Sequence, residues 1–196
     1  YFLTRMPSPK IILQAFADVK PKLVIAVPLI IEKIIKKNVL PKLETPTMKF
    51  LMRVPLVNDK IKAKVREQLM NAFGGEFYQI IVGGAAFNQE IEAFLRSINF
   101  PYTVGYGMTE CAPLICYRNW REFAMRSCGM AVDRLEVRID SEDPQNVVGE
   151  IQIKGDNVMD GYYKNPEATK QAFTEDGWLR SGDLGVIDAE GNVFIK

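Results

Sequence analysis

Histidine is absent from the 196 residues of this chain. Without imidazole, the chain cannot supply a Ser/His/Asp or Cys/His nucleophile system, an imidazole general base or histidine ligands for a metal. Any chemistry in this chain therefore has to depend on carboxylates, lysines, backbone amides or a bound cofactor.

Cysteine and long apolar runs are also scarce. Cys111, Cys116 and Cys128 are too few and too unevenly spaced for a disulfide framework, and without histidine they cannot complete a four-ligand zinc site. A reducing, cytoplasmic location is expected. The longest apolar run, Leu23 to Ile31, has nine residues, whereas about 18 are needed to span a bilayer. The sequence predicts neither a membrane span nor a signal peptide.

Two common catalytic signatures are missing. The sequence contains no Gly-x4-Gly-Lys-Ser/Thr phosphate loop and no Gly-x-Ser-x-Gly turn, which disfavours ordinary P-loop NTPases and α/β-hydrolases. The chain also begins at Tyr1 without a methionine and ends at Lys196 in a predicted strand. We therefore expect it to be an excerpt of a longer protein.

The net charge of +1 conceals two opposed regions. Residues 1–75 carry 14 Lys+Arg against 5 Asp+Glu, a net charge of +9, and residues 76–196 carry 11 against 19, a net charge of −8. The basic region is suited either to a polyanion or anionic membrane surface, such as the inner membrane face, or to plain solvation. One predicted helix favours the membrane alternative by placing three lysines beside four isoleucines, namely Lys33, Lys36 and Lys37 beside Ile30, Ile31, Ile34 and Ile35.

Hydrophobic periodicity predicts alternating helices and strands in the first part of the chain. The expected helices cover residues 10–19, 28–37, 60–73 and 88–97, and the expected buried strands cover 23–27, 77–82 and 102–104. This alternation implies crossover connections and a parallel sheet up to about residue 110.

Beyond that part, short alternating segments separated by turn residues indicate antiparallel β structure, interrupted by one short helix. Asn165 and Pro166 are suited to begin that helix, and residues 185–195 are typical of a hairpin. The predicted fold class is α/β, a parallel sheet with helices followed by a smaller β-rich, distorted barrel-like subdomain. The expected boundaries are 1–115 for the α/β subdomain and 116–196 for the β-rich subdomain.

Small residues follow the predicted strand 77–82. Gly83, Gly84 and Ala85 lie where open α/β sheets bind ligands; the glycines allow the backbone to approach a ligand closely, and nearby amides are able to face an anion. A tight strand-to-helix turn explains the same residues equally well.

A second motif, GYGMTE at 105–110, follows the predicted strand 102–104. It begins like a dinucleotide fingerprint, but Glu110 replaces the third glycine and Pro113 follows, so the dinucleotide interpretation fails. Tyr106 is able to stack on a base, Thr109 to contact a phosphate and Glu110 to bind Mg²⁺ through its carboxylate oxygens. A polar loop without a ligand remains the alternative.

Two further motifs lie near the end of the chain. In RSGDLG at 180–185, the Asp183 carboxylate is able to accept hydrogen bonds from both hydroxyls of a ribose; the alternative is an Asp-Gly-type turn between strands. The motif GYYKNP at 161–166 is interpreted as structural, with aromatic packing ahead of a helix start.

The order of these motifs resembles the adenylate-forming superfamily. The resemblance is carried by GGAA at 83–86, YGMTE at 106–110, GEIQIKG at 149–155, GYYKNPEAT at 161–169 and DGWLRSGDLG at 176–185. Within that superfamily, YGMTECAPL at 106–114 and VPLIIEKI at 27–34 are most similar to bacterial long-chain fatty acyl-CoA synthetases. The resemblance implies part of a large AMP-binding domain. It also implies a reaction in which a fatty acid and ATP give an acyl-adenylate, from which coenzyme A displaces AMP.

The resemblance also implies a nucleotide site. Gly83, Gly84 and Ala85 would form a backbone wall along the adenine and the acyl pocket, Tyr106 would stack on the adenine, and Asp183 would bind the ribose hydroxyls.

The catalytic residues implied by the resemblance are Thr109 and Glu110. Thr109 would contact phosphate, Glu110 would hold the Mg²⁺ that neutralises the leaving pyrophosphate, and Gly107 would line the nucleotide site between them and Tyr106. Ser181 replaces the threonine that is commoner in its motif and keeps the hydroxyl.

The implied cofactors are ATP and Mg²⁺, with coenzyme A as co-substrate and a fatty acid as substrate; no nucleic acid partner is expected. The superfamily's phosphate loop and its adenylation lysine, which Lys196 does not match, lie outside this chain, so the fragment alone is expected to be inactive.

The residues leave open the preferred acyl chain length, the oligomeric state and whether the basic half meets a membrane or the phosphates of coenzyme A. Two alternatives remain: an adenylating enzyme for another carboxylic acid, and a non-catalytic lipid or membrane-surface module.

Overall fold

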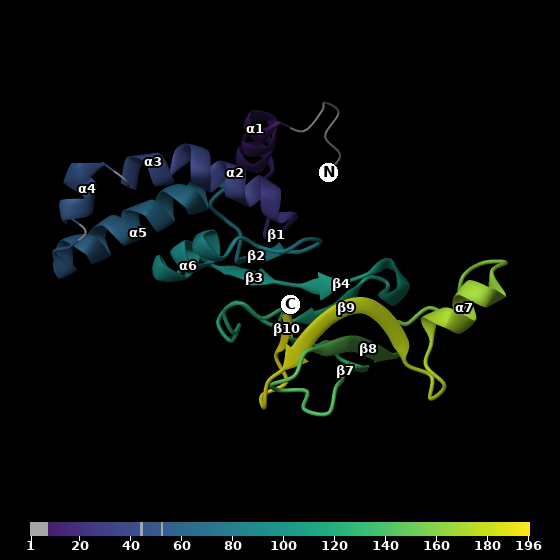
Figure 1. Cartoon of the computed structure of the whole chain (residues 1–196). Coiled ribbons are helices and arrows are strands. Elements are labelled where there is room, and N and C mark those ends of the chain that lie inside the picture. Colours follow the sequence, from purple (N-terminus) through teal and green to yellow (C-terminus); the bar gives the residue numbers. More distant parts are fainter. Residues whose placement is uncertain (1–7, 44, 52) are drawn as a thin grey trace. The chain divides into compact units, whose positions relative to one another are not determined.

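A computed structural model of the chain describes residues 8–43, 45–51 and 53–196. The chain divides into two compact units, Tyr1–Tyr102 and Thr103–Lys196, which we call unit 1 and unit 2. Figure 1 labels most of their helices and strands. No helix among the described residues has the length and apolar character that crossing a membrane requires.

Unit 1 alternates helices with strands. Its elements are α1 (Pro9–Val19), β1 (Leu23–Ala26), α2 (Pro28–Asn38), α3 (Leu40–Leu43), α4 (Pro46–Leu51), α5 (Pro55–Ala72), β2 (Gln79–Val82) and α6 (Gln89–Ser97), followed by β3 (Tyr102–Val104), which crosses the boundary. β1 and β2 are parallel, and β3 lies on the other side of β2. The predicted helices and parallel sheet are confirmed, whereas the short helices α3 and α4 are additional.

Aromatic side chains form much of the core of unit 1. Phe73, Phe77 and Phe100 are at most 3% exposed, and their ring centroids lie 5.7–6.1 Å apart. Phe16 of α1 joins them, with its ring 5.4 Å from Phe73. These contacts pack α1 and the end of α5 against the segments that lead into β2 and β3.

α2 turns most of its isoleucines toward the core. Ile31, Ile34 and Ile35 are at most 1% exposed, whereas Lys33 and Lys36 are exposed. A helix whose apolar side packs inward does not present that side to a lipid surface. Ile31, Ile34 and Ile35 therefore belong to the core of unit 1, and Lys33 and Lys36 lie on the exposed side of α2.

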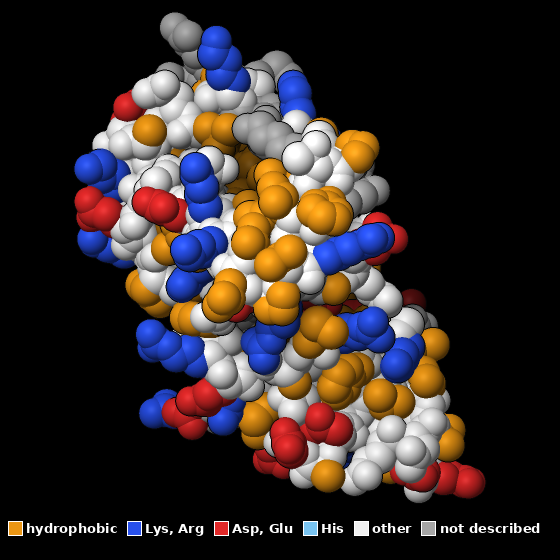
Figure 2. All heavy atoms as spheres, turned by 90° about the vertical axis from the view of Figure 1, so that its left-hand side faces the viewer, with side chains coloured by type: hydrophobic (Ala, Val, Ile, Leu, Met, Phe, Trp, Pro, Cys, Tyr) orange, Lys and Arg blue, Asp and Glu red, His pale blue; other side chains and the backbone are white. Residues whose placement is uncertain are grey.

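β1 is covered on only one face, and the prediction of a fully buried strand is wrong for it. Val24 is 4% exposed, but its neighbour Ile25 is 74% exposed. Phe50 and Leu56 of the helical part are also exposed, by 67% and 79%. Figure 2 shows hydrophobic side chains interspersed with Lys and Arg on the face that it draws. The described residues of unit 1 thus include apolar side chains that are exposed on its surface.

Unit 2 is mainly antiparallel β structure. Its elements are β4 (Tyr106–Gly107), the 3-10 turn η1 (Thr109–Cys111), β5 (Leu114–Tyr117), β6 (Met130–Ala131), β7 (Leu135–Asp140), β8 (Gly149–Gly155), α7 (Pro166–Ala172), β9 (Leu179–Ile187) and β10 (Val193–Ile195). The strands form two sheets in the orders β4-β5-β6 and β10-β9-β8-β7. β9 curves as an arch (Figure 1), so the predicted β-rich, barrel-like region is confirmed as a curled sheet.

The parallel part of the chain ends earlier than expected. β4 already pairs antiparallel with β5, with Tyr106 opposite Cys116. The prediction that parallel structure continues to about residue 110 is therefore wrong, because the strand after β3 turns back on β5 instead of crossing over.

Asparagine side chains begin two helices, as predicted. Asn88 accepts hydrogen bonds from the N–H groups of Glu90 and Ile91, each at 3.0 Å. Asn165 accepts one from the N–H of Ala168 at 3.1 Å, ahead of Pro166. Both contacts satisfy backbone donors that have no partner within the helix.

α5 ends in a glycine turn against α1. Gly74 and Gly75 have φ values of +95° and +76°, and the N–H of Gly75 donates to the carbonyl of Met70 at 2.8 Å. A Cβ atom on Gly74 would lie 2.5 Å from the carbonyl oxygen of Phe16. Glycine is therefore required both by the backbone conformation and by the approach of α1.

Replacing Gly74 tests this packing. Gly74→Ala is expected to lower the free energy of unfolding by about 3 kcal/mol, because a positive φ and overpacking each cost of order 1–3 kcal/mol. Gly84→Ala is the control: Gly84 has a φ of +84° but only Val27 Cγ1 near its Cβ position, at 3.9 Å. Urea unfolding followed by circular dichroism should show the larger loss for Gly74→Ala, and equal losses would contradict the close approach.

Candidate functional site

Gly83, Gly84 and Ala85 follow β2 in unit 1. The N–H of Gly83 donates to the carbonyl of Ala26 at 3.2 Å, so the loop starts beside the end of β1. Gly84 and Ala85 are exposed, and Gly84 adopts a positive φ. The segment is exposed backbone at the carboxyl ends of β1 and β2, the edge at which open α/β sheets bind ligands.

The expectation that nearby amides face an anion is not supported at the start of α6. The amides of Glu90 and Ile91 already donate to the side chain of Asn88. The N–H of Asn88 itself donates to Oε1 of Glu32 at 3.1 Å. The exposed part of this loop is therefore the backbone of residues 83–85, whereas the N–H groups of Asn88, Glu90 and Ile91 already have partners within the chain.

In unit 2, the structure brings two of the predicted motifs together. The hydroxyl of Tyr106 donates to Oδ2 of Asp183 at 2.6 Å, although the two residues are 77 positions apart. Tyr106 is 7% exposed, whereas Asp183 is exposed. Burial and the hydrogen bond to Asp183 both raise the pKa of Tyr106, so its hydroxyl remains a donor.

Asp183 lies on a bulge within β9 and not in a turn between strands. The pairing of β8 with β9 shifts register between Glu150 and Gln152, and Gly182 has a φ of +76°. A bulge bends a strand and redirects its side chains. The alternative of an Asp-Gly-type turn is therefore wrong, and the bulge accounts for both the curvature of β9 and the exposure of Asp183.

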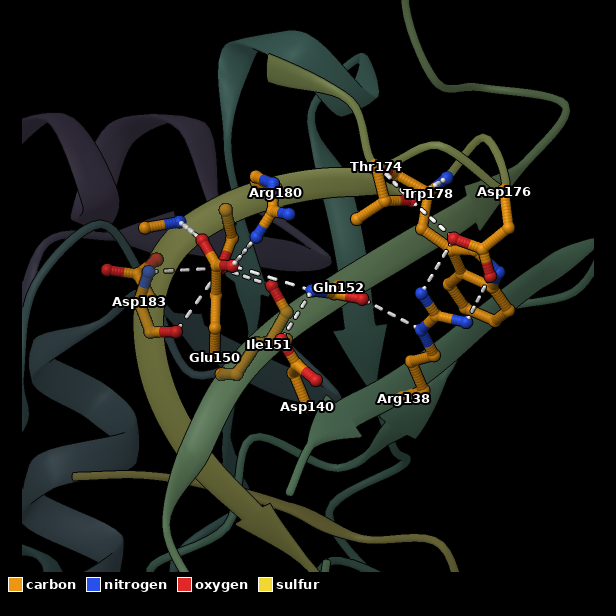
Figure 3. A network of polar contacts seen from close by, with 12 residues as sticks. Arg138, Asp140, Glu150, Ile151, Gln152, Thr174, Asp176, Trp178, Arg180 and Asp183 are labelled. Carbon is orange, nitrogen blue, oxygen red and sulfur yellow. Dashed lines mark hydrogen bonds and ion pairs between the residues drawn. The ribbon is translucent and has the colours of Figure 1, made fainter. Parts of the chain in front are cut away.

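Side chains fasten the bulge to β8. The hydroxyl of Ser181 donates to the carbonyl of Ile151 at 2.6 Å and accepts from the N–H of Asp183 at 3.0 Å. The carboxylate of Glu150 accepts from the N–H of Gly182 at 3.2 Å and from Arg180 at 3.0 Å. Figure 3 shows these contacts converging on the segment that carries Asp183. The Ser181 hydroxyl, which the substitution of serine for the commoner threonine retains, thus ties the bulge to the neighbouring strand.

The network continues to a clamp at the start of β9. Arg138 donates to both carboxylate oxygens of Asp176, at 2.6 and 3.0 Å, and its guanidinium lies 4.4 Å from the ring centroid of Trp178. The hydrogen bond from Arg138 lowers the pKa of Asp176, and the contact with Asp176 raises that of Arg138. Gln152 links Arg138 to the rest of the network in Figure 3, accepting from it at 2.7 Å. This clamp fixes the strand that leads to Asp183.

Thr109 and Glu110 lie in η1, directly after β4. Thr109 is exposed, and its side chain has no hydrogen bond within the part of the chain that the structure describes. Glu110 is half-buried, and its Oε1 accepts from the hydroxyl of Tyr162 at 2.9 Å. Its backbone carbonyl accepts from the N–H of Met159 at 2.8 Å. The segment after β8 therefore holds Glu110 at both its carboxylate and its backbone.

The prediction that Tyr162 and Tyr163 provide aromatic packing is wrong. Their exposed fractions are 42% and 87%. Tyr162 instead uses its hydroxyl on Glu110, a contact that spacing along the sequence could not reveal because 52 residues separate them. Asn157, which lay in no predicted site, donates to the carbonyls of Cys111 and Leu114 at 2.6 and 3.0 Å.

Gly107 allows β4 and β5 to come close together. A Cβ atom on Gly107 would collide with the carbonyl oxygen of Pro113, which also accepts from the N–H of Met108 at 2.8 Å. Gly107 is exposed. It therefore combines a tight backbone approach with a surface that a ligand can reach.

The surroundings of Cys111 and Cys116 do not favour reactive thiolates, and the described residues contain no site with several metal ligands. Burial and then the nearby charge of Glu110 raise the pKa of Cys111 to about 11, and burial also raises that of Cys116. Protonated thiols are poor nucleophiles. Across residues 8–43, 45–51 and 53–196, no three His, Cys, Asp or Glu side chains come together as a metal site.

Comparisons with known proteins identify relatives of this chain. The profile of the family described as "AMP-binding enzyme" matches residues 1–163. A 4-coumarate-CoA ligase from Narcissus pseudonarcissus is 35% identical over 156 residues, which cover 72% of this chain and 28% of the relative. Long-chain-fatty-acid–CoA ligase 4 from Saccharomyces cerevisiae is 34% identical over 145 residues, covering 71% of this chain and 20% of the relative. The chain thus spans less than a third of the length of these relatives.

A solved structure shares the fold. The o-succinylbenzoate coenzyme A synthetase from Bacillus subtilis, solved in complex with ATP and magnesium, matches with a TM-score of 0.69 at 22% identity. The match covers 96% of this chain and 34% of that one. At this identity the similarity establishes the α/β fold with its curled second part.

Ser181 offers a test of the bulge. Ser181→Ala is expected to lower the free energy of unfolding by about 1 kcal/mol, the usual net contribution of an intramolecular hydrogen bond. Ser181→Thr keeps the hydroxyl and should retain most of that stability. Guanidinium unfolding of the two variants measures the difference. If Ser181→Thr and Ser181→Ala lower the free energy of unfolding equally, the Ser181 hydroxyl does not hold the bulge.

Proposed function

Because the chain belongs to the AMP-binding enzyme family, we propose that it forms part of an ATP-dependent acyl-CoA synthetase. In the proposed reaction, a carboxylate attacks the α-phosphorus of ATP to form an acyl-adenylate and release pyrophosphate. The thiol of coenzyme A then attacks the acyl carbon and displaces AMP. The observation that carries the proposal is the 2.6 Å hydrogen bond between Tyr106 and Asp183, which joins an aromatic ring to an exposed carboxylate.

In this proposal, Tyr106 and Asp183 hold the nucleoside. The ring of Tyr106 stacks on the adenine, and Asp183 accepts hydrogen bonds from the ribose hydroxyls. Oδ1 of Asp183 has no partner among the described residues, while Oδ2 is held by Tyr106. The hydroxyl of Tyr106 therefore orients Asp183 and leaves acceptor capacity for a ribose.

The donor set at η1 fits Mg²⁺. Oε2 of Glu110 has no hydrogen-bond partner within the described ranges. Glu110 is also not part of a group of three or more His, Cys, Asp or Glu side chains among those residues. Mg²⁺ typically takes one or two carboxylates and completes its shell with water and substrate phosphates. When bound, the ion supplies charge neutralisation for the departing pyrophosphate. Glu110 holds that ion, the exposed Thr109 hydroxyl donates to a phosphate, and Gly107 lets the polyphosphate approach the backbone.

This chemistry needs no histidine. Phosphoryl-centre reactions depend mainly on positioning and on electrostatic stabilisation of the transition state. The side chains that face the proposed nucleotide, Tyr106, Thr109, Glu110 and Asp183, supply stacking, hydrogen bonds and a cation ligand. The lack of imidazole in the sequence is therefore compatible with the proposed reaction.

For the acid, we propose a long-chain fatty acid. The similarity of YGMTECAPL and VPLIIEKI to long-chain synthetases supports this choice, and so does the relatedness to the yeast long-chain enzyme. A second candidate acid is 4-coumarate, favoured by the 35% identity to the Narcissus ligase. The two acids differ in shape and rigidity, so one acyl pocket is not expected to serve both equally well.

Pyrophosphate exchange decides between these acids. The full-length protein carrying this chain should exchange labelled pyrophosphate into ATP with palmitate, and at least tenfold more slowly with 4-coumarate or acetate, because a pocket shaped for one acid discriminates by about 1–3 kcal/mol per mismatched group. Preference for 4-coumarate would replace the fatty acid proposal with the second candidate. Exchange with none of a panel of acids would contradict the adenylation proposal itself.

A further inference from the structure

The hydroxyl of Tyr162 is directed at the carboxylate of Glu110. The oxygens lie 2.9 Å apart, and the contact joins the loop between β8 and α7 to η1. Neither residue is on a strand, so sheet pairing does not impose the contact.

The loop that carries Tyr162 is itself fixed. The N–H of Tyr162 donates to Oγ1 of Thr169 on α7 at 2.9 Å, and Thr169 in turn donates to the carbonyl of Asn165 at 2.9 Å. Gly161, with a φ of +153°, lies against Thr169 so closely that a Cβ atom would be 2.6 Å from its Cγ2. The ring of Tyr162 therefore starts from a backbone anchored on α7.

A second set of contacts holds η1 and the residues after it against this loop. The N–H of Met159 donates to the carbonyl of Glu110, and Asn157 donates to the carbonyls of Cys111 and Leu114. Backbone and side-chain contacts from residues 157–162 thus surround Glu110. Among them, the hydroxyl of Tyr162 is the group that reaches the carboxylate itself.

The chemistry of this contact suits a cation ligand. A neutral O–H donor on one carboxylate oxygen restricts rotation of the side chain and leaves the second oxygen for a metal. The phenolic O–H of an unperturbed tyrosine, with a pKa of about 10, is protonated at neutral pH and is able to donate this hydrogen bond. A lysine or arginine at the same place would instead add a positive charge next to the cation.

We propose that Tyr162 is a positioning residue for the divalent cation bound by Glu110, with its hydroxyl holding Oε1 so that Oε2 faces the metal. This inference rests on the proposed function for the identity of the cation as Mg²⁺. It adds a residue, outside the YGMTE motif, on which cation binding depends.

The direct test is a titration with Mn²⁺ as the probe for Mg²⁺. The full-length protein is mixed with a non-hydrolysable ATP analogue, and free Mn²⁺ is measured by electron paramagnetic resonance. Tyr162→Phe removes only the hydroxyl and should weaken Mn²⁺ binding about tenfold, the lower end of the effect of losing a partner of a metal ligand. Tyr163→Phe is the matched control, because Tyr163 is 87% exposed and its ring contacts the Lys164 ammonium rather than Glu110. It should leave the affinity unchanged.

The same change in a Glu110→Ala background separates positioning from folding. If Tyr162 acts through Glu110, Tyr162→Phe should have no further effect on Mn²⁺ affinity once Glu110 is truncated. In pyrophosphate exchange, the Mg²⁺ concentration for half-maximal rate should rise about tenfold in Tyr162→Phe, with the rate at saturating Mg²⁺ within about threefold of the original.

Three results would overturn the inference: unchanged Mn²⁺ affinity in Tyr162→Phe, an equal loss with and without Glu110, or Mn²⁺ binding that does not depend on Glu110. Failure of the proposed function is recognised by a different result. In that case the unsubstituted protein does not catalyse pyrophosphate exchange with any of the acids tested. The Mn²⁺ titration is independent of turnover and decides the role of Tyr162 in either case.

Discussion

The hydrogen bond from Tyr106 to Asp183 is the contact on which the candidate site depends. It connects β4, in one sheet of unit 2, to the bulge of β9, in the other. The donor is buried and the acceptor is exposed, so the protein interior fixes the direction of a carboxylate that faces solvent. The ring of Tyr106 and the carboxylate of Asp183 are thereby held at a set separation. If they bind a nucleoside as proposed, this order reduces the entropic cost of fixing them on binding.

β8 provides the platform for this arrangement. Its residues Glu150 and Ile151 hold the bulge through Gly182 and Ser181, while Gln152 connects to the Arg138 clamp. The segment that follows β8 then reaches Glu110 through Met159 and Tyr162. One strand and the loop after it thus position both proposed halves of the site, the nucleoside contacts and the cation ligand. Contacts made by β8 and this loop therefore bring motifs that are far apart in the sequence together in unit 2.

Much of the fold follows from local sequence signals. Asn88 and Asn165 begin helices because their side chains satisfy free backbone donors. The alternation of apolar residues in the later part of the chain indicates the antiparallel structure to which β7 and β8 belong. The sequence also singles out the motifs around Tyr106 and Asp183 as candidates, because an aromatic ring is suited to stacking on a base and a carboxylate to binding a ribose. Other features depend on tertiary contacts that no local pattern encodes. The bulge at Gly182 requires the register of β8, the exposure of Ile25 depends on what covers β1, and the role of Tyr162 depends on a partner 52 residues away.

A double-mutant cycle on ATP affinity tests the central claim most directly. Tyr106→Phe keeps the ring and removes the hydroxyl, and Asp183→Asn removes the charge that the hydroxyl holds. Calorimetric titration of the full-length protein with ATP should show that the two changes are coupled by about 1 kcal/mol or more, because the residues act as one unit. Additive losses, or ATP affinity that neither change affects, would contradict a nucleotide site built on the Tyr106–Asp183 hydrogen bond.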